Sequence, residues 1–70
     1  MMTVEELIDR YYASGTFNVS LFTETSAEHI GDFKNDSIGI KAYLKYKIGL
    51  WYFGKTENSL VLFIKEENKA

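Results

Sequence analysis

Few residues in this 70-residue chain have side chains suited to chemistry. His29 is the single histidine, and Glu28 and Asp32 beside it could form a metal or acid–base site with it. A stable zinc site usually takes about four well-placed ligands, and one histidine with two scattered carboxylates falls short. The chain has no Cys, and its five Gly form neither a phosphate-binding loop nor a dinucleotide-binding turn. We therefore expect a non-enzymatic protein without metal or cofactor, and interpret His29 as a solvated loop histidine.

Carboxylates are the first candidate binding groups. Residues 1–36 hold seven acidic and two basic residues, a charge of −5, whereas residues 37–70 hold six basic and three acidic residues, a charge of +3. The net charge of −2 hides this polarity. The predicted acidic surface comprises Glu5, Glu6, Asp9, Glu24, Glu28, Asp32 and Asp36.

Three of these carboxylates fall on one predicted helix. Glu5 and Asp9 are four residues apart and Glu6 adjoins them, which spaces them about 5–6 Å apart on a helix. This spacing is of the same order as that of phosphates in a nucleic-acid backbone, so the row could present a phosphate-like surface to a basic protein. The alternative is an ordinary solvated helix face, with acidic residues favoured by the helix dipole.

Lysines alternating with aromatic residues give a second candidate surface. Lys41, Tyr43, Lys45 and Lys47 fall on one side of a predicted strand, with Trp51 beyond. Such a face could bind phosphates and stack bases, which makes a small nucleic-acid-binding protein the alternative function. Lysines on an exposed strand also simply hinder aggregation.

The element that must position the acidic row is an amphipathic helix over residues 3–14. Thr3 and Glu6 form a capping box at its start, and Gly15 is placed to end it. Its apolar face has the spacing of one helical stripe and consists of Val4, Leu7, Ile8, Tyr11 and Tyr12.

The remaining pattern predicts strands. We expect a strand over 16–24, a polar loop with turns over 23–37, a long strand over 38–54, a turn at 55–58 and a last strand over 59–65. The long strand should bend or bulge at Gly49, and the less favoured alternative is a hairpin after Tyr46. Residues 66–70 should fray. The prediction of the long strand is based on apolar residues at every even position from Ile38 to Leu50.

These elements predict a single α+β domain over residues 1–70, with the N-terminal amphipathic helix packed on a small antiparallel sheet of about three strands. One helix covers only one face of a sheet, so apolar surface should remain for a homodimer or another partner. Which aromatic residues share a face depends on the register of the last hairpin, which the sequence leaves open. The candidates for this apolar interface are Tyr43, Trp51, Phe53 and Phe63.

A short, Cys-free and Pro-free chain, rich in aromatic residues and with a capped helix before a small sheet, resembles the small host-takeover proteins of lytic bacteriophages. Among them it is most similar to DNA-mimicking inhibitors of bacterial HU-type nucleoid proteins. The resemblance implies an inhibitor whose acidic residues occupy the DNA-binding surface of a basic host protein. DNA mimics are usually more acidic than −2, so only a local patch could act in this way. We expect neither a signal peptide nor a membrane span, and expect the chain in the host bacterial cytoplasm.

Overall fold

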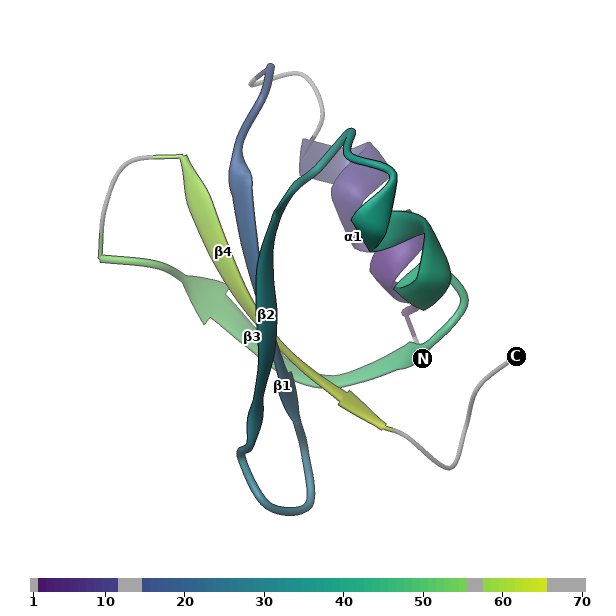
Figure 1. Cartoon of the computed structure of the whole chain (residues 1–70), viewed down its shortest axis with the longest axis vertical. Helices are drawn as coiled ribbons and strands as arrows, with labels where there is room; N and C mark the ends of the chain where they lie inside the picture. The colour runs from purple at the N-terminus through teal and green to yellow at the C-terminus, as the bar shows by residue number, and fades with distance from the viewer. Residues whose placement is uncertain (1, 12–14, 56–57, 66–70) are drawn as a thin grey trace.

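The helices of the described residues lie against one face of a four-stranded sheet (Figure 1). The computed structural model describes residues 2–11, 15–55 and 58–65. In chain order the elements are helix α1 (Val4–Tyr11), strands β1 (Asn18–Thr23) and β2 (His29–Lys34), the 3-10 helix η2 (Gly39–Tyr43), and strands β3 (Lys47–Phe53) and β4 (Ser59–Lys65). No helix among these residues is long and apolar enough to cross a membrane.

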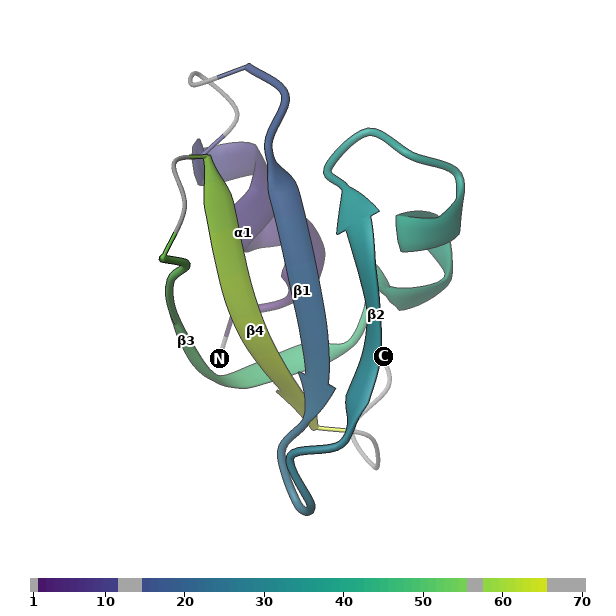
Figure 2. The ribbon, with the colours of Figure 1, turned by 60° about the vertical axis from the view of Figure 1, so that its left-hand side comes forward.

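The sheet has the order β2-β1-β4-β3, which Figure 2 shows side by side. The two outer pairs, β1–β2 and β3–β4, are antiparallel, whereas the central strands β1 and β4 run parallel. The sheet is therefore mixed, and both β2 and β3 are edge strands.

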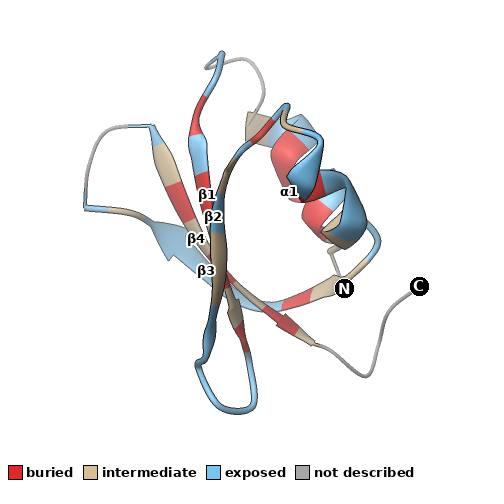
Figure 3. Ribbon diagram, in the orientation of Figure 1, coloured by how far each residue is buried: buried red, intermediate tan, exposed pale blue. Residues whose placement is uncertain are grey.

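Strict alternation along the two central strands builds the core. In β1 the side chains of Val19, Leu21 and Thr23 are buried, and in β4 the same pattern buries Leu60, Leu62 and Ile64. These side chains meet the apolar stripe of α1 and Ile40 of η2, so the buried residues gather between the sheet and the helices (Figure 3). Among the described residues no helix covers the opposite face, which we call the open face.

Helix α1 confirms the predicted N-terminal helix. It begins at the predicted capping box, and Val4, Leu7 and Ile8 are buried as the stripe requires. The α-helix ends at Tyr11, and the predicted end over 12–14 lies outside the described residues. Gly15 has φ +88°, the left-handed conformation expected of a residue that follows a helix.

The predicted polar loop over 23–37 contains a strand, β2, and the sheet has four strands, which is roughly consistent with the predicted sheet of about three. Its central pair is also parallel, which corrects the expectation of an antiparallel sheet. β2 lacked a strong apolar signal because it lies at the sheet edge, where its residues are only half-buried or exposed. His29 accordingly belongs to a strand and not to a loop.

The predicted long strand over 38–54 is wrong in its first half. Residues Gly39–Tyr43 form η2, so Lys41 and Tyr43 do not lie on a strand, and Lys45 lies in the turn before β3. The second half is confirmed as β3, and its pairing with β4 shifts register between Ile48 and Leu50, where the bend at Gly49 was expected. The last strand has the predicted bounds. Residues 66–70, predicted to fray, lie outside the described residues.

Candidate binding surfaces

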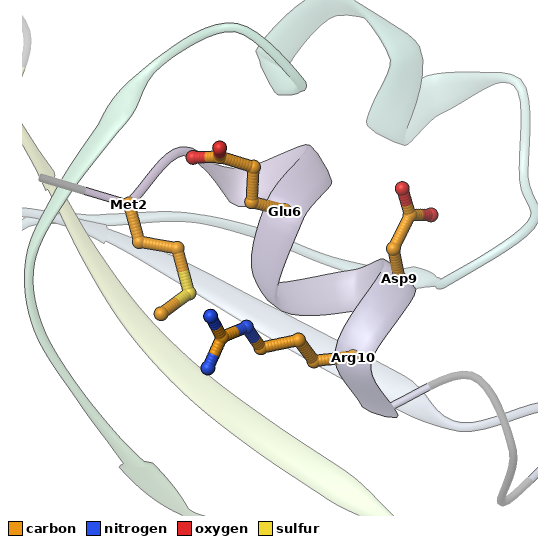
Figure 4. A pocket seen from close by; sticks show the side chains of 4 residues that line it. All are labelled: Met2, Glu6, Asp9 and Arg10. Atoms are coloured by element: carbon orange, nitrogen blue, oxygen red, sulfur yellow. The ribbon is translucent and has the colours of Figure 1, made fainter.

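The outer side of α1 carries the three helix carboxylates. Glu5, Glu6 and Asp9 are all exposed, while the opposite side of the helix packs into the core. Figure 4 shows the Glu6 and Asp9 carboxylates on the same side of the helix, with the Arg10 guanidinium reaching back toward Met2. These side chains border a shallow depression lined by Met2, Glu6, Asp9 and Arg10. The structure thus brings together the acidic row predicted for this helix.

Glu6 also has a structural task. The Thr3 N–H donates to Glu6 Oε1 at 2.8 Å, and the Glu6 N–H donates to Thr3 Oγ1 at 3.2 Å. The backbone hydrogen bond from Thr3 holds the pKa of Glu6 below its ordinary value of 4.5, so its carboxylate is charged at neutral pH. The N–H groups of Val4 and Glu5 donate to the carbonyls of Tyr46 and Leu44, both at 2.9 Å. The N–H groups of this first turn therefore already have acceptors, and the turn presents carboxylates instead of free N–H donors that could bind an anion.

The other predicted acidic residues lie elsewhere. Glu24 contacts Lys65, with 3.7 Å between Oε1 and Nζ. Asp32 points to the open face, because it pairs with Ser20, the residue between the buried Val19 and Leu21. The remaining two acidic residues, Glu28 and Asp36, are exposed before and after β2. The seven acidic residues therefore form no single surface.

His29 and Asp32 form a local pair on β2. His29 Nε2 lies 3.0 Å from Asp32 Oδ1, and hydrogen bonds from the Ser20 hydroxyl and from His29 lower the pKa of Asp32. Within the described ranges no group of three or more His, Cys, Asp or Glu residues is placed to hold a metal ion. Glu28, the third residue of the site considered from sequence, is exposed in the turn before β2.

A row of rings crosses the open face, and the sequence analysis missed it. The ring centroids of His29 and Phe22 are 5.0 Å apart, those of Phe22 and Phe63 are 5.2 Å apart, and those of Phe63 and Tyr52 are 6.1 Å apart. The row therefore takes one residue from each strand in the order β2, β1, β4, β3. The signal that could have found it is Phe22, which interrupts the polar side of β1.

Three lysines lie on the same face as this row. Lys34 pairs with Asn18, and Lys47 pairs with Lys65. The adjacent residues in these strands point into the core, so the three lysines point to the open face. Like charges directly opposite each other destabilise a strand pair, and the Glu24 carboxylate beside Lys65 offsets this repulsion. Of the predicted lysine row only Lys47 belongs to this face.

The predicted apolar interface is divided among three places. Trp51 and Phe53 lie together on the helix side of β3, with ring centroids 5.5 Å apart, and Phe53 also contacts Tyr11 at 5.6 Å. Phe63 lies on the open face. Tyr43 lies in η2, where its ring packs near those of Phe33 and Tyr46, each at 5.7 Å.

Comparison with known proteins adds no relative: no protein family, curated protein or solved structure matches this chain.

Proposed function

We propose that this chain is a non-enzymatic inhibitory binding protein that presents the acidic outer face of α1 to a basic DNA-binding protein and blocks the binding of DNA to it. The observation that carries the proposal is the exposure of Glu5, Glu6 and Asp9 together on one rigid helix. An HU-type nucleoid protein in the bacterial cytoplasm is the proposed target, and a small phage protein for host takeover is the proposed setting.

The geometry favours α1 over the other acidic residues. Residues one helical turn apart have their Cβ atoms about 5–6 Å from one another, a spacing of the same order as that of the charges along a nucleic-acid backbone. Glu24 and Asp32 already have partners in Lys65 and His29, so they offer less free charge to a target. A contact limited to one helix also agrees with a net charge of only −2.

The test replaces Glu5, Glu6 and Asp9 by Gln, Gln and Asn. Gln at position 6 can keep the capping hydrogen bond, so the free energy of unfolding should change by less than about 1 kcal/mol. We expect the affinity for an HU-type protein, measured by fluorescence anisotropy, to fall at least tenfold. The wild-type complex should weaken as salt rises, and DNA should displace the protein from its target.

The matched control replaces Glu28 by Gln and Asp36 by Asn, which removes exposed charge away from α1. This variant should bind the target as the wild type does. A ternary complex of DNA, target and this protein, or a triple variant that binds with unchanged affinity, would contradict the proposal.

The row of rings supports a second candidate, a nucleic-acid-binding protein that uses the open face. Aromatic residues on neighbouring strands can stack unpaired bases while lysines contact the phosphates. Phe22 and Phe63 are half-buried, however, and face each other with an angle of 24° between their ring planes. Their ring faces are thus partly occupied, which is why we rank this candidate second.

A titration with a labelled single-stranded oligonucleotide separates the two candidates. For an open-face binder we expect Tyr52→Ala and Lys47→Gln each to weaken oligonucleotide binding, while the α1 triple variant leaves it unchanged. If the wild-type protein leaves the anisotropy of the oligonucleotide unchanged even at low salt, the second candidate is wrong.

A further inference from the structure

Strand β3 presents a run of exposed apolar residues at the edge of the sheet. Leu50, Trp51, Tyr52 and Phe53 are 55%, 38%, 51% and 60% exposed. Leu50 and Tyr52 pair with Phe63 and Val61 and so lie on the open face, while Trp51 and Phe53 lie on the helix side. The run therefore shows apolar surface on both sides of one strand.

The two edges of the sheet differ sharply in charge. The edge strand β2 carries His29, Asp32 and Lys34, and η2 packs beside it. β3 has no charged residue between Lys47 and Lys55. Charged side chains on an edge strand normally prevent its pairing with another chain, and an uncharged apolar edge favours that pairing.

The chain itself covers the first part of the β3 edge. Thr3 forms an isolated bridge with Lys47, and the Ile48 N–H donates to the Met2 carbonyl at 2.9 Å. Within the described part of the chain, this cover stops where the exposed run begins. The part of the edge left for another strand is therefore the segment from Gly49 to Phe53.

We propose that this segment pairs with the same segment of a second copy, antiparallel and about a two-fold axis perpendicular to the sheet. Such an axis keeps the helix sides of both copies on one side of a continuous sheet. Leu50 and Tyr52 then meet apolar residues of the partner on the open face, and Trp51 and Phe53 do so on the helix side. No charged residue belongs to the paired segment, and the Glu24 carboxylate lies against Gly49 at its start.

The exposed area agrees with a dimer of modest affinity. An aromatic side chain can bury about 150–250 Å², so at their observed exposures the four side chains offer roughly 300–500 Å² per copy. Two copies with their paired backbones would approach the lower end of the roughly 1,200–2,000 Å² of specific interfaces. A second copy also supplies an edge of matching length and alternation, and association stabilises small domains.

The test is the oligomeric state of wild-type and variant chains, without any other protein, so it is independent of the function proposed for α1. Sedimentation equilibrium from about 1 μM to about 1 mM should show a monomer–dimer equilibrium. Leu50→Lys places a charge in the paired segment, and we expect it to raise the dimer dissociation constant at least tenfold. Ile38→Lys also introduces a lysine at an exposed apolar residue (84%), directly before η2, which packs beside the opposite edge strand β2, and should leave the constant unchanged.

Amide hydrogen exchange of the wild-type chain gives a second measurement that needs no variant. Exchange in the segment Gly49–Phe53 should slow as the protein concentration rises, while exchange in β2 stays constant. A strict monomer over the whole concentration range overturns the proposal. So does a dimer whose β3 amides show no dependence on concentration, or an assembly that keeps growing beyond two copies.

Discussion

Hydrogen bonds of polar side chains stabilise the starts of two elements, α1 and β1. Thr3 and Glu6 exchange hydrogen bonds at the start of α1, and Asn35, which is buried, accepts a hydrogen bond from the Phe17 N–H at 2.9 Å just before β1. The first arrangement spans three residues, so a local pattern predicted it. The second joins residues eighteen apart, and from sequence Asn35 indicated only a turn. A local pattern cannot show a hydrogen bond that depends on the path of the chain between its partners.

The capping box predicts a pH dependence at this scale. The pKa of Glu6 is lowered in the folded state, so its contribution to stability is present above the ordinary value of 4.5 and is lost as the pH falls through the lowered pKa. Thr3→Ala should remove about 1 kcal/mol of stability at neutral pH through loss of the cap. It should raise the pKa of Glu6 only part of the way toward 4.5, because the side-chain hydrogen bond is lost while the backbone N–H of residue 3, the larger cause of the lowered pKa, still donates to Glu6. An NMR titration measures this change.

Thr16→Ala changes an exposed threonine outside α1 and serves as the control for this substitution. It should leave the Glu6 titration unchanged. A Glu6 pKa that returns fully to 4.5 in Thr3→Ala would show that the backbone hydrogen bond is not the main cause of the lowered value.

At the scale of elements, prediction succeeded where one periodicity held and one face was fully buried. α1 and β4 satisfy both conditions, and the predicted helix start and both bounds of β4 are confirmed. The strand prediction for residues 38–46 is wrong because it relied on apolar residues at even positions. The side chains that pack against the core are Ile40, Tyr43 and Leu44, which have the spacing of a helical turn. β2 escaped prediction because an edge strand need not bury either face fully.

Ile38 and Ile40 test this correction. In a strand both would point to the same side, whereas here Ile38 is 84% exposed and Ile40 only 1%. Ile40→Ala should therefore cost about 2–5 kcal/mol of stability, and Ile38→Ala less than about 0.5 kcal/mol. Chemical denaturation measures both values, and similar losses at the two positions would favour the strand.

At the scale of the whole molecule, the parallel pair β1–β4 decides which residues share a surface. The exposed acidic row on α1 followed from local spacing and could be predicted. The placement of Asp32 on the opposite side of the sheet from α1, and of Phe22 beside Phe63, depends on long-range register that no local pattern contains. The predicted binding residues therefore form one coherent group on α1 and scattered positions elsewhere.

The position of β4 between β1 and β3 predicts that the chain cannot fold without it. A fragment of residues 1–55 lacks β4, and its β1 and β3 have no strand between them. We expect this fragment to show no cooperative thermal transition by circular dichroism. A synthetic peptide of residues 58–65 added in excess should restore part of the cooperative transition. Cooperative unfolding of the fragment alone would contradict the central role of β4.

This strand order has a consequence for synthesis in the cell. β4 is the last of the four strands of this sheet to leave the ribosome, yet it supplies half of the central pair and the buried residues Leu60, Leu62 and Ile64. Until β4 emerges, β1 and β3 each expose an apolar side to the crowded surroundings of the exit tunnel. Folding must therefore be completed after translation of β4 and not alongside it, and a nascent chain stalled before Ser59 should remain sensitive to protease and open to chaperones.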